Sequence, residues 1–107
     1  MWITTQEGTF LGEGRICLLR EIEKHGSISQ AAKAMKMSYK KAWELVNSMN
    51  KNGPELIVTP KTGGVGGGGS VLSETGKKAI VLFEKLDSDN KAYLEDKLRE
   101  LNFALCV

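Results

Sequence analysis

The sequence predicts a mainly α fold with a small β wing (α+β), arranged as a winged helix-turn-helix followed by a C-terminal dimerisation helix. Residues 26–50 contain two serine-capped helical segments separated by a turn of about three residues, as a helix-turn-helix requires. Residues 56–72 place two β-type segments around a glycine loop. Residues 74–107 repeat leucine at helical spacing. These three observations divide the chain into a winged-helix domain over residues 1–73 and a helix over residues 74–107.

The chain before the helix pair is predicted to form a short β element and one helix. Residues 1–12 alternate loosely between apolar and polar side chains, which favours a short hairpin or an edge strand. In the following segment Ile16, Leu19 and Ile22 recur at helical spacing, and Gly26 supplies the stop. The first helix is therefore expected between residues 14 and 25.

The two helices of the pair are marked by their caps. Ser27 and Gln30 form a capping-box pattern, and Ser29 offers a second possible N-cap for the same helix. Ser38 is a good N-cap for a helix from Tyr39 to about residue 50. One stripe of this second helix is expected to face the core, and consists of Ala42, Trp43, Val46 and Met49. The opposite stripe is polar and consists of Lys40, Glu44, Asn47, Ser48 and Lys51.

The wing is predicted from residues 56–72. Residues 56–59 have the composition of a strand and residues 71–72 that of its shorter partner, with six glycines in the seven positions from 63 to 69. A nucleotide-binding loop would end in Gly-Lys-Ser/Thr before a helix, whereas this run leads through Gly69 and Ser70 into a strand. A flexible linker is the alternative interpretation of the glycines.

Ser73 can cap the last helix, whose apolar residues fall into two groups. The first group contains Ile80, Leu82, Phe83 and Leu86, and the second contains Leu94, Leu98, Leu101 and Leu105. Because the two groups do not share one heptad register, the sequence leaves open whether the helix is continuous through residues 87–90 or kinks, rotates its face or breaks near Asn90. The second group would leave a leucine stripe in water, so it predicts a homodimer.

Composition narrows the classes of function. The net charge is +2, but residues 33–61 alone hold six lysines against two glutamates, which concentrates the basic excess on the helix-turn-helix. No segment approaches the roughly 20 apolar residues of a membrane span, and no signal-peptide pattern opens the chain. We therefore expect a cytoplasmic protein with no membrane partner and with double-stranded DNA as its partner.

Catalytic and metal-binding functions find little support. Cys17 and Cys106 lack the spacing of a metal site, and His25 is the only histidine. No nucleophile and base can be paired, so the sequence predicts neither an enzyme, nor a metal site, nor a cofactor.

The candidate DNA-contacting residues lie at the helix starts, on the exposed stripe and at the wing base. They are Ser27, Ser29, Gln30, Ser38, Tyr39, Lys40, Lys41, Glu44, Lys61 and Thr62. Those at the start of the first helix of the pair could equally serve only as caps. The candidate dimerisation residues are Leu94, Leu98, Leu101 and Leu105. The alternative function is a protein-interaction adaptor that keeps the winged-helix fold without specific DNA binding.

Four segments resemble the N-terminal DNA-binding domain of the ModE family of molybdate-responsive transcription regulators, and more distantly the LysR-type winged helix. They are residues 25–32, 38–43, 47–50 and 62–72. The resemblance implies a DNA-binding regulator connected with molybdenum homeostasis, whose last helix makes a dimer. Full-length members continue into a C-terminal region that senses molybdate, whereas this chain ends at Val107. We therefore expect a regulator without the sensing domain, and no molybdate binding by this chain.

Overall fold

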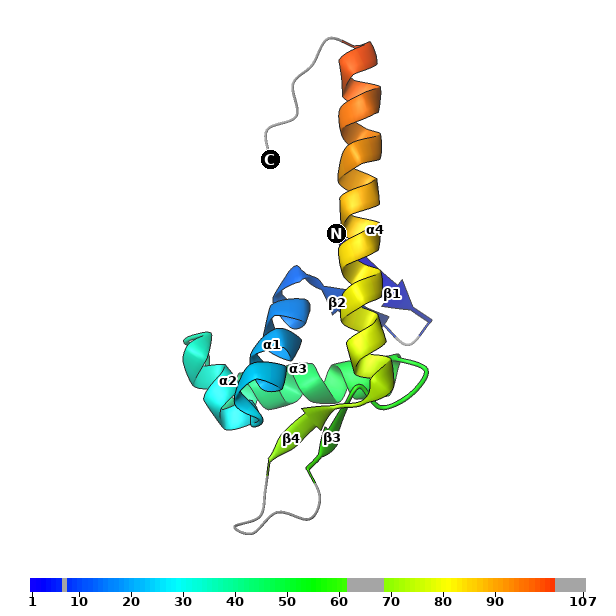
Figure 1. Ribbon diagram of the computed structural model, residues 1–107. Helices are drawn as coiled ribbons and strands as arrows, with labels where there is room; N and C mark the ends of the chain where they lie inside the picture. Colours follow the sequence, from blue (N-terminus) through cyan, green and yellow to red (C-terminus); the bar gives the residue numbers. More distant parts are fainter. Residues whose placement is uncertain (7, 62–68, 102–107) are drawn as a thin grey trace.

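The computed structural model describes residues 1–6, 8–61 and 69–101. Its elements, in chain order, are β1 (Trp2–Thr5), β2 (Gly8–Gly12), α1 (Glu13–His25), α2 (Ile28–Ala34), α3 (Tyr39–Asn52), β3 (Val58–Pro60), β4 (Ser70–Leu72) and α4 (Glu74–Glu100). Figure 1 shows α1, α2 and α3 packed into one body, with β3 and β4 below it and α4 rising away from it. The predicted winged helix with a long C-terminal helix is confirmed.

The hydrophobic core lies where α1, α2, α3 and the first turns of α4 meet. Ile16, Leu19 and Ile22 of α1 are fully buried, as their helical spacing predicts. Burial of each such side chain contributes about 1.5–3 kcal/mol. Ala31 and Ala32 of α2 are also buried, and their small size allows the neighbouring helices to approach closely.

The N-terminal hairpin is fastened to the second half of α3. β1 and β2 pair antiparallel. The Arg15 guanidinium donates hydrogen bonds to the Thr9 carbonyl oxygen at 3.1 Å and to the Ser48 hydroxyl at 2.9 Å. The Asn52 amide donates to the same Thr9 oxygen at 2.8 Å. Partial burial lowers the pKa of Arg15 below its ordinary value.

The wing strands pair antiparallel, Val58 opposite Leu72, but β3 is shorter than predicted. The expectation that the strand begins at Leu56 is wrong, because Leu56 is exposed and the ladder starts at Val58. The physical reason is the side chain of Asn50, whose Oδ1 accepts hydrogen bonds from the backbone N–H groups of Ile57 at 2.7 Å and Val58 at 3.0 Å. The glycine loop over residues 62–68 lies outside the described residues.

The last helix, α4, is one continuous element through residues 87–90, so among the alternatives that the sequence leaves open a break near Asn90 is excluded. Two ion pairs stabilise the polar stretch, and in each the partners lie one helical turn apart. Lys85 pairs with Asp89 at 3.1 Å, and Asp87 pairs with Lys91 at 3.2 Å. Figure 1 shows α4 extending well beyond the helical body. Within the described residues, no helix combines the length and apolar character needed to cross a membrane.

The joint between the wing and α4 contains a single residue, Ser73. Its hydroxyl accepts from the backbone N–H of Gly76 at 2.9 Å, and so caps α4 as predicted. The same hydroxyl donates to the Leu56 carbonyl oxygen at 2.6 Å. A Cβ at Gly76 would lie 2.4 Å from the Ile57 carbonyl oxygen, so only glycine permits this close packing of helix on strand.

Candidate nucleic-acid interface

Both helices of the helix-turn-helix begin at the predicted serines. The Ser27 hydroxyl accepts from the backbone N–H of Gln30 at 2.9 Å, and the Ser38 hydroxyl accepts from that of Lys41 at 3.1 Å. Ser29 is exposed in the first turn of α2 and is not the cap. Free N–H groups and the helix dipole favour an anion at such helix starts.

Helix α3 buries one face and exposes the other. Ala42, Val46 and Met49 are buried. On the exposed side lie the predicted candidates Tyr39, Lys40, Lys41 and Glu44, together with Asn47 and Lys51.

Trp43 does not belong to the buried face of α3, contrary to the prediction. Its side chain is 49% exposed. Trp43 follows Ala42 directly, and one residue turns an α-helix by about 100°, which carries the indole out of the buried stripe. The sequence pattern missed this side chain as a candidate for the interface.

The lysines of residues 33–61 form no ion pair within the described parts of the chain. This set contains Lys33, Lys36, Lys40, Lys41, Lys51 and Lys61. The helical body therefore presents its basic excess without neutralising carboxylates at contact distance. Such uncompensated cations are available to phosphate groups.

The base of the wing is held against the turn between α1 and α2. The Ser70 backbone N–H donates to the Gly26 carbonyl oxygen at 2.9 Å, and the Lys61 N–H donates to Gly69 at the same distance. The Lys61 side chain is exposed beside this contact. Thr62, the other wing candidate, lies outside the described residues.

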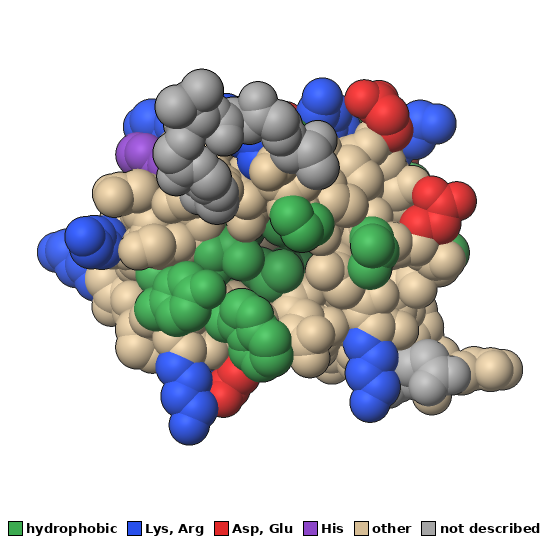
Figure 2. Space-filling view, turned by 90° about the horizontal axis from the view of Figure 1, so that it is seen from below, with side chains coloured by type: hydrophobic (Ala, Val, Ile, Leu, Met, Phe, Trp, Pro, Cys, Tyr) green, Lys and Arg blue, Asp and Glu red, His purple; other side chains and the backbone are tan. Residues whose placement is uncertain are grey.

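Figure 2 looks onto the face formed by the helix-turn-helix and the wing. Hydrophobic side chains gather near its centre, and Lys and Arg side chains stand around its margin with some Asp and Glu side chains among them. A hollow of about 170 Å³ opens here between the start of α2, the exposed side of α3 and the strands β3 and β4. The face combines a charged margin, which includes lysines, with a partly apolar centre.

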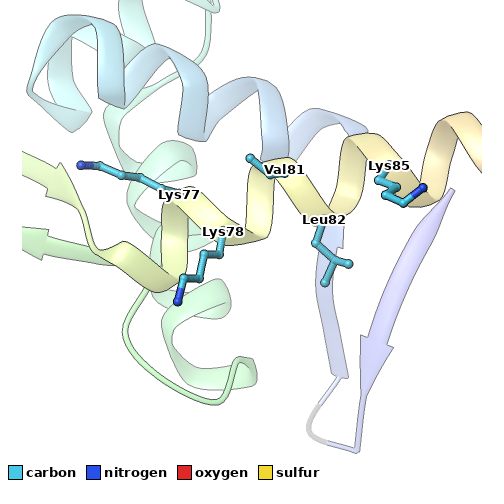
Figure 3. A pocket seen from close by; sticks show the side chains of 5 residues that line it. All are labelled: Lys77, Lys78, Val81, Leu82 and Lys85. Atoms are coloured by element: carbon cyan, nitrogen blue, oxygen red, sulfur yellow. The ribbon is translucent and has the colours of Figure 1, made fainter.

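The dimerisation candidates lie on the part of α4 beyond the helical body. Leu94 is 42% and Leu101 is 66% exposed, Leu98 is half-buried, and Leu105 lies outside the described residues. Sequence reasoning named Leu82 and Leu86 among the apolar residues of this helix but missed that they are exposed. With Val81 and Tyr93 they form a second exposed apolar set. Figure 3 shows Val81 and Leu82 on α4 among three lysine side chains, where they line a shallow hollow of about 390 Å³.

No family model matches the chain, but curated relatives do. It is 37% identical over 102 residues to the molybdenum transport protein ModE of Azotobacter vinelandii, covering 95% of the chain and 38% of that protein. It is 44% identical over 81 residues to the DNA-binding transcriptional dual regulator ModE of Escherichia coli strain K12, covering 76% of the chain and 31% of that protein. The chain is a relative of the ModE family. It spans about a third of the length of these ModE proteins.

The fold is shared with a LysR-type regulator of known structure. The full-length LTTR LysG of Corynebacterium glutamicum, solved with bound effector arginine, superposes with a TM-score of 0.54 at 19% identity, covering 84% of the chain and 30% of LysG. At this identity the likeness establishes the winged-helix fold alone. The names of the ModE relatives are not those of enzymes, which supports the expectation that this chain is not one.

Proposed function

We propose that this chain is a sequence-specific DNA-binding transcriptional regulator of ModE type that binds duplex DNA as a homodimer. One structural observation supports the DNA-binding part most strongly: the lysines around the exposed face of α3 have no carboxylate partner among the described residues. Lys40, Lys41 and Lys61 would neutralise phosphates, while the exposed side of α3 enters the major groove. The capped start of α2 would meet a backbone phosphate.

The homodimer is proposed on α4. Its exposed apolar side chains need cover, and a second copy of the helix supplies the same pattern. Residues 74–86 carry three lysines against two glutamates, whereas residues 87–101 carry three cations against five carboxylates. An antiparallel pair therefore sets the more basic half of one helix against the more acidic half of its partner. A two-fold dimer of this kind would recognise a palindromic operator.

Selection from a random duplex pool at near-physiological salt tests the proposed function. We expect an enriched palindromic motif that binds about a thousandfold more tightly than random duplex. A pool with no enriched motif would contradict sequence-specific binding.

Replacement of Lys40, Lys41 or Lys61 by alanine separates this function from a protein-interaction adaptor. For each lysine that contacts a phosphate, affinity should fall and the slope of log K against log salt should become shallower by about 1.8, which is about 0.9 for each protomer of the dimer. Lys91→Ala is the matched control, because it removes the same charge from α4, away from the proposed DNA interface; sedimentation first confirms that this variant keeps the oligomeric state of the wild type. An adaptor would show no effect of the three substitutions on its partner.

A further inference from the structure

Trp43 and Asn47 lie one helical turn apart on α3, so both side chains point to the same side of the helix. Trp43 is 49% exposed and Asn47 is exposed. Tyr39, a further turn towards the N-terminus, is 55% exposed. Tyr39 and Trp43 do not belong to the hydrophobic core, so their exposed aromatic surface on α3 is available to a partner.

Three asparagines of α3 serve different purposes. The amide of Asn50 makes three hydrogen bonds to the backbone of Ile57 and Val58, and the amide of Asn52 donates to Thr9 and Ser48. Within the described chain, the side chain of Asn47 makes no hydrogen bond, so its donor and acceptor are both available. Fold stability accounts for Asn50 and Asn52 but not for Asn47.

The hollow beside these side chains is lined by both apolar and polar groups. Ile28, Trp43 and Pro60 contribute apolar groups, and Asn47 is among the polar residues. Its volume is about 170 Å³, which admits a methyl group projecting from a larger surface.

We propose that Trp43 and Asn47 read A·T base pairs in the major groove, Trp43 by contact with the thymine methyl group and Asn47 by paired hydrogen bonds to the adenine edge. The inference rests on the proposed function and specifies the base chemistry that α3 recognises. Asparagine matches the N6 donor and N7 acceptor of adenine, and the thymine methyl is the one apolar group in the major groove. Guanine is read by arginine or lysine; α3 contains no arginine, and Lys40 and Lys41 are assigned above to phosphates.

Removal of single methyl groups from the selected operator tests the role of Trp43. Each thymine is replaced in turn by deoxyuridine, and affinities are measured for the wild type and for Trp43→Ala. At one thymine or more per half-site we expect the wild type to lose several-fold in affinity, whereas Trp43→Ala is indifferent to the methyl. An equal loss in both proteins at every position would overturn the assignment.

Substitution of 7-deazaadenine, which lacks the N7 acceptor, tests Asn47 in the same way. The wild type should lose roughly tenfold at the adenine that Asn47 contacts, and Asn47→Ala should lose nothing further there. Asn47→Ala should keep the thermal stability of the wild type, because its side chain makes no bond within the described chain. If Asn47→Ala still distinguishes adenine from 7-deazaadenine, Asn47 is not the reader.

Fluorescence provides a readout that needs no change at Trp43. In Trp2→Phe, the only remaining indole is that of Trp43. Its emission should change on saturation with the operator, and an unchanged spectrum would exclude Trp43 from the interface.

The proposed function and the A·T assignment would fail in different ways. If the wild type does not bind DNA, the proposed function itself is wrong. If binding depends on the lysines but Trp43→Ala loses as much affinity as the wild type when a thymine methyl is removed, only the A·T assignment is wrong.

Discussion

Helices α3 and α4 are both amphipathic and rich in lysine, but they use their charges in opposite ways. On α4, Lys77, Lys85, Lys91 and Lys97 each lie within 3.6 Å of a carboxylate three or four residues away. On α3, the lysines have no such partner in the described chain, and Glu44 is the helix's single acidic residue. The lysines of α4 are therefore largely neutralised by carboxylates of the same helix, whereas the lysines of α3 are not. The comparison shows that the two helices differ in the ion pairing of their lysines rather than in how many lysines they contain.

The largest expected effect falls on the exposed apolar side of α4. Replacement of Leu98 and Leu101 by lysine should convert the proposed dimer into monomers, because each leucine buried at an interface contributes about 1.5–3 kcal/mol and a buried charge adds a desolvation cost. Sedimentation equilibrium measures the change. The double variant should retain the helical content of the wild type, since both side chains lie beyond the helical body. A variant that remains dimeric would place the interface elsewhere.

Asn50→Ala is expected to destabilise the domain by more than Asn47→Ala on the same helix. It leaves the N–H groups of Ile57 and Val58 without their acceptor, at about 1–3 kcal/mol for each group cut off from water. Asn47→Ala should change stability by less than about 0.5 kcal/mol. Urea unfolding of both variants provides the comparison, and equal midpoints would show that Asn50 does not hold the wing.

Alanine substitutions of the two serines at the start of α2 should differ by a smaller amount in their effect on the free energy of unfolding. Ser27→Ala removes the cap and should cost about 1 kcal/mol, whereas Ser29→Ala should be nearly neutral. Thermal unfolding measures stability, and DNA affinity then reports on phosphate contact separately. Weaker DNA binding by Ser29→Ala at unchanged stability would assign Ser29 to the interface, and unchanged binding would remove it from the candidates.

The smallest effect on stability is expected from loss of an ion pair within α4. Lys91→Ala breaks the ion pair with Asp87 and should cost at most about 0.5 kcal/mol, because exposed pairs one turn apart contribute little. Unfolding at low and high salt measures this contribution, which should shrink as salt screens the pair. A cost of several kcal/mol would show that the polar stretch near Asn90 depends on this one pair.

Local signals in the sequence predicted most of the fold. The caps at Ser27, Ser38 and Ser73 and the glycine at residue 26 each act on neighbouring residues, so their effects can be derived from short segments. The continuity of α4 was predictable in principle, because Lys85 with Asp89 and Asp87 with Lys91 have the spacing of helical ion pairs.

Contacts between different secondary-structure elements explain why the start of β3 and the exposure of Trp43 were not predicted. Asn50 shortens β3 through hydrogen bonds to residues seven and eight positions away, which no local pattern reveals. Trp43 lies beside a buried stripe, and hydrophobicity alone assigns a large indole to the core. Its exposure depends on where the wing strands lie relative to α3. The DNA-contacting residues remain predictions.

Ser73 has a mechanical consequence. Its hydroxyl bonds to both the first turn of α4 and the segment entering β3, and its backbone N–H donates to the Ile57 carbonyl oxygen at 2.9 Å. Because Gly76 packs directly on that carbonyl, no hinge separates the long helix from the wing. Any torque applied to the far end of α4 would therefore turn the wing with it. In the proposed dimer, the angle between two α4 helices would set the distance between two wings, and anything that tilts the helices would change how both wings meet the duplex.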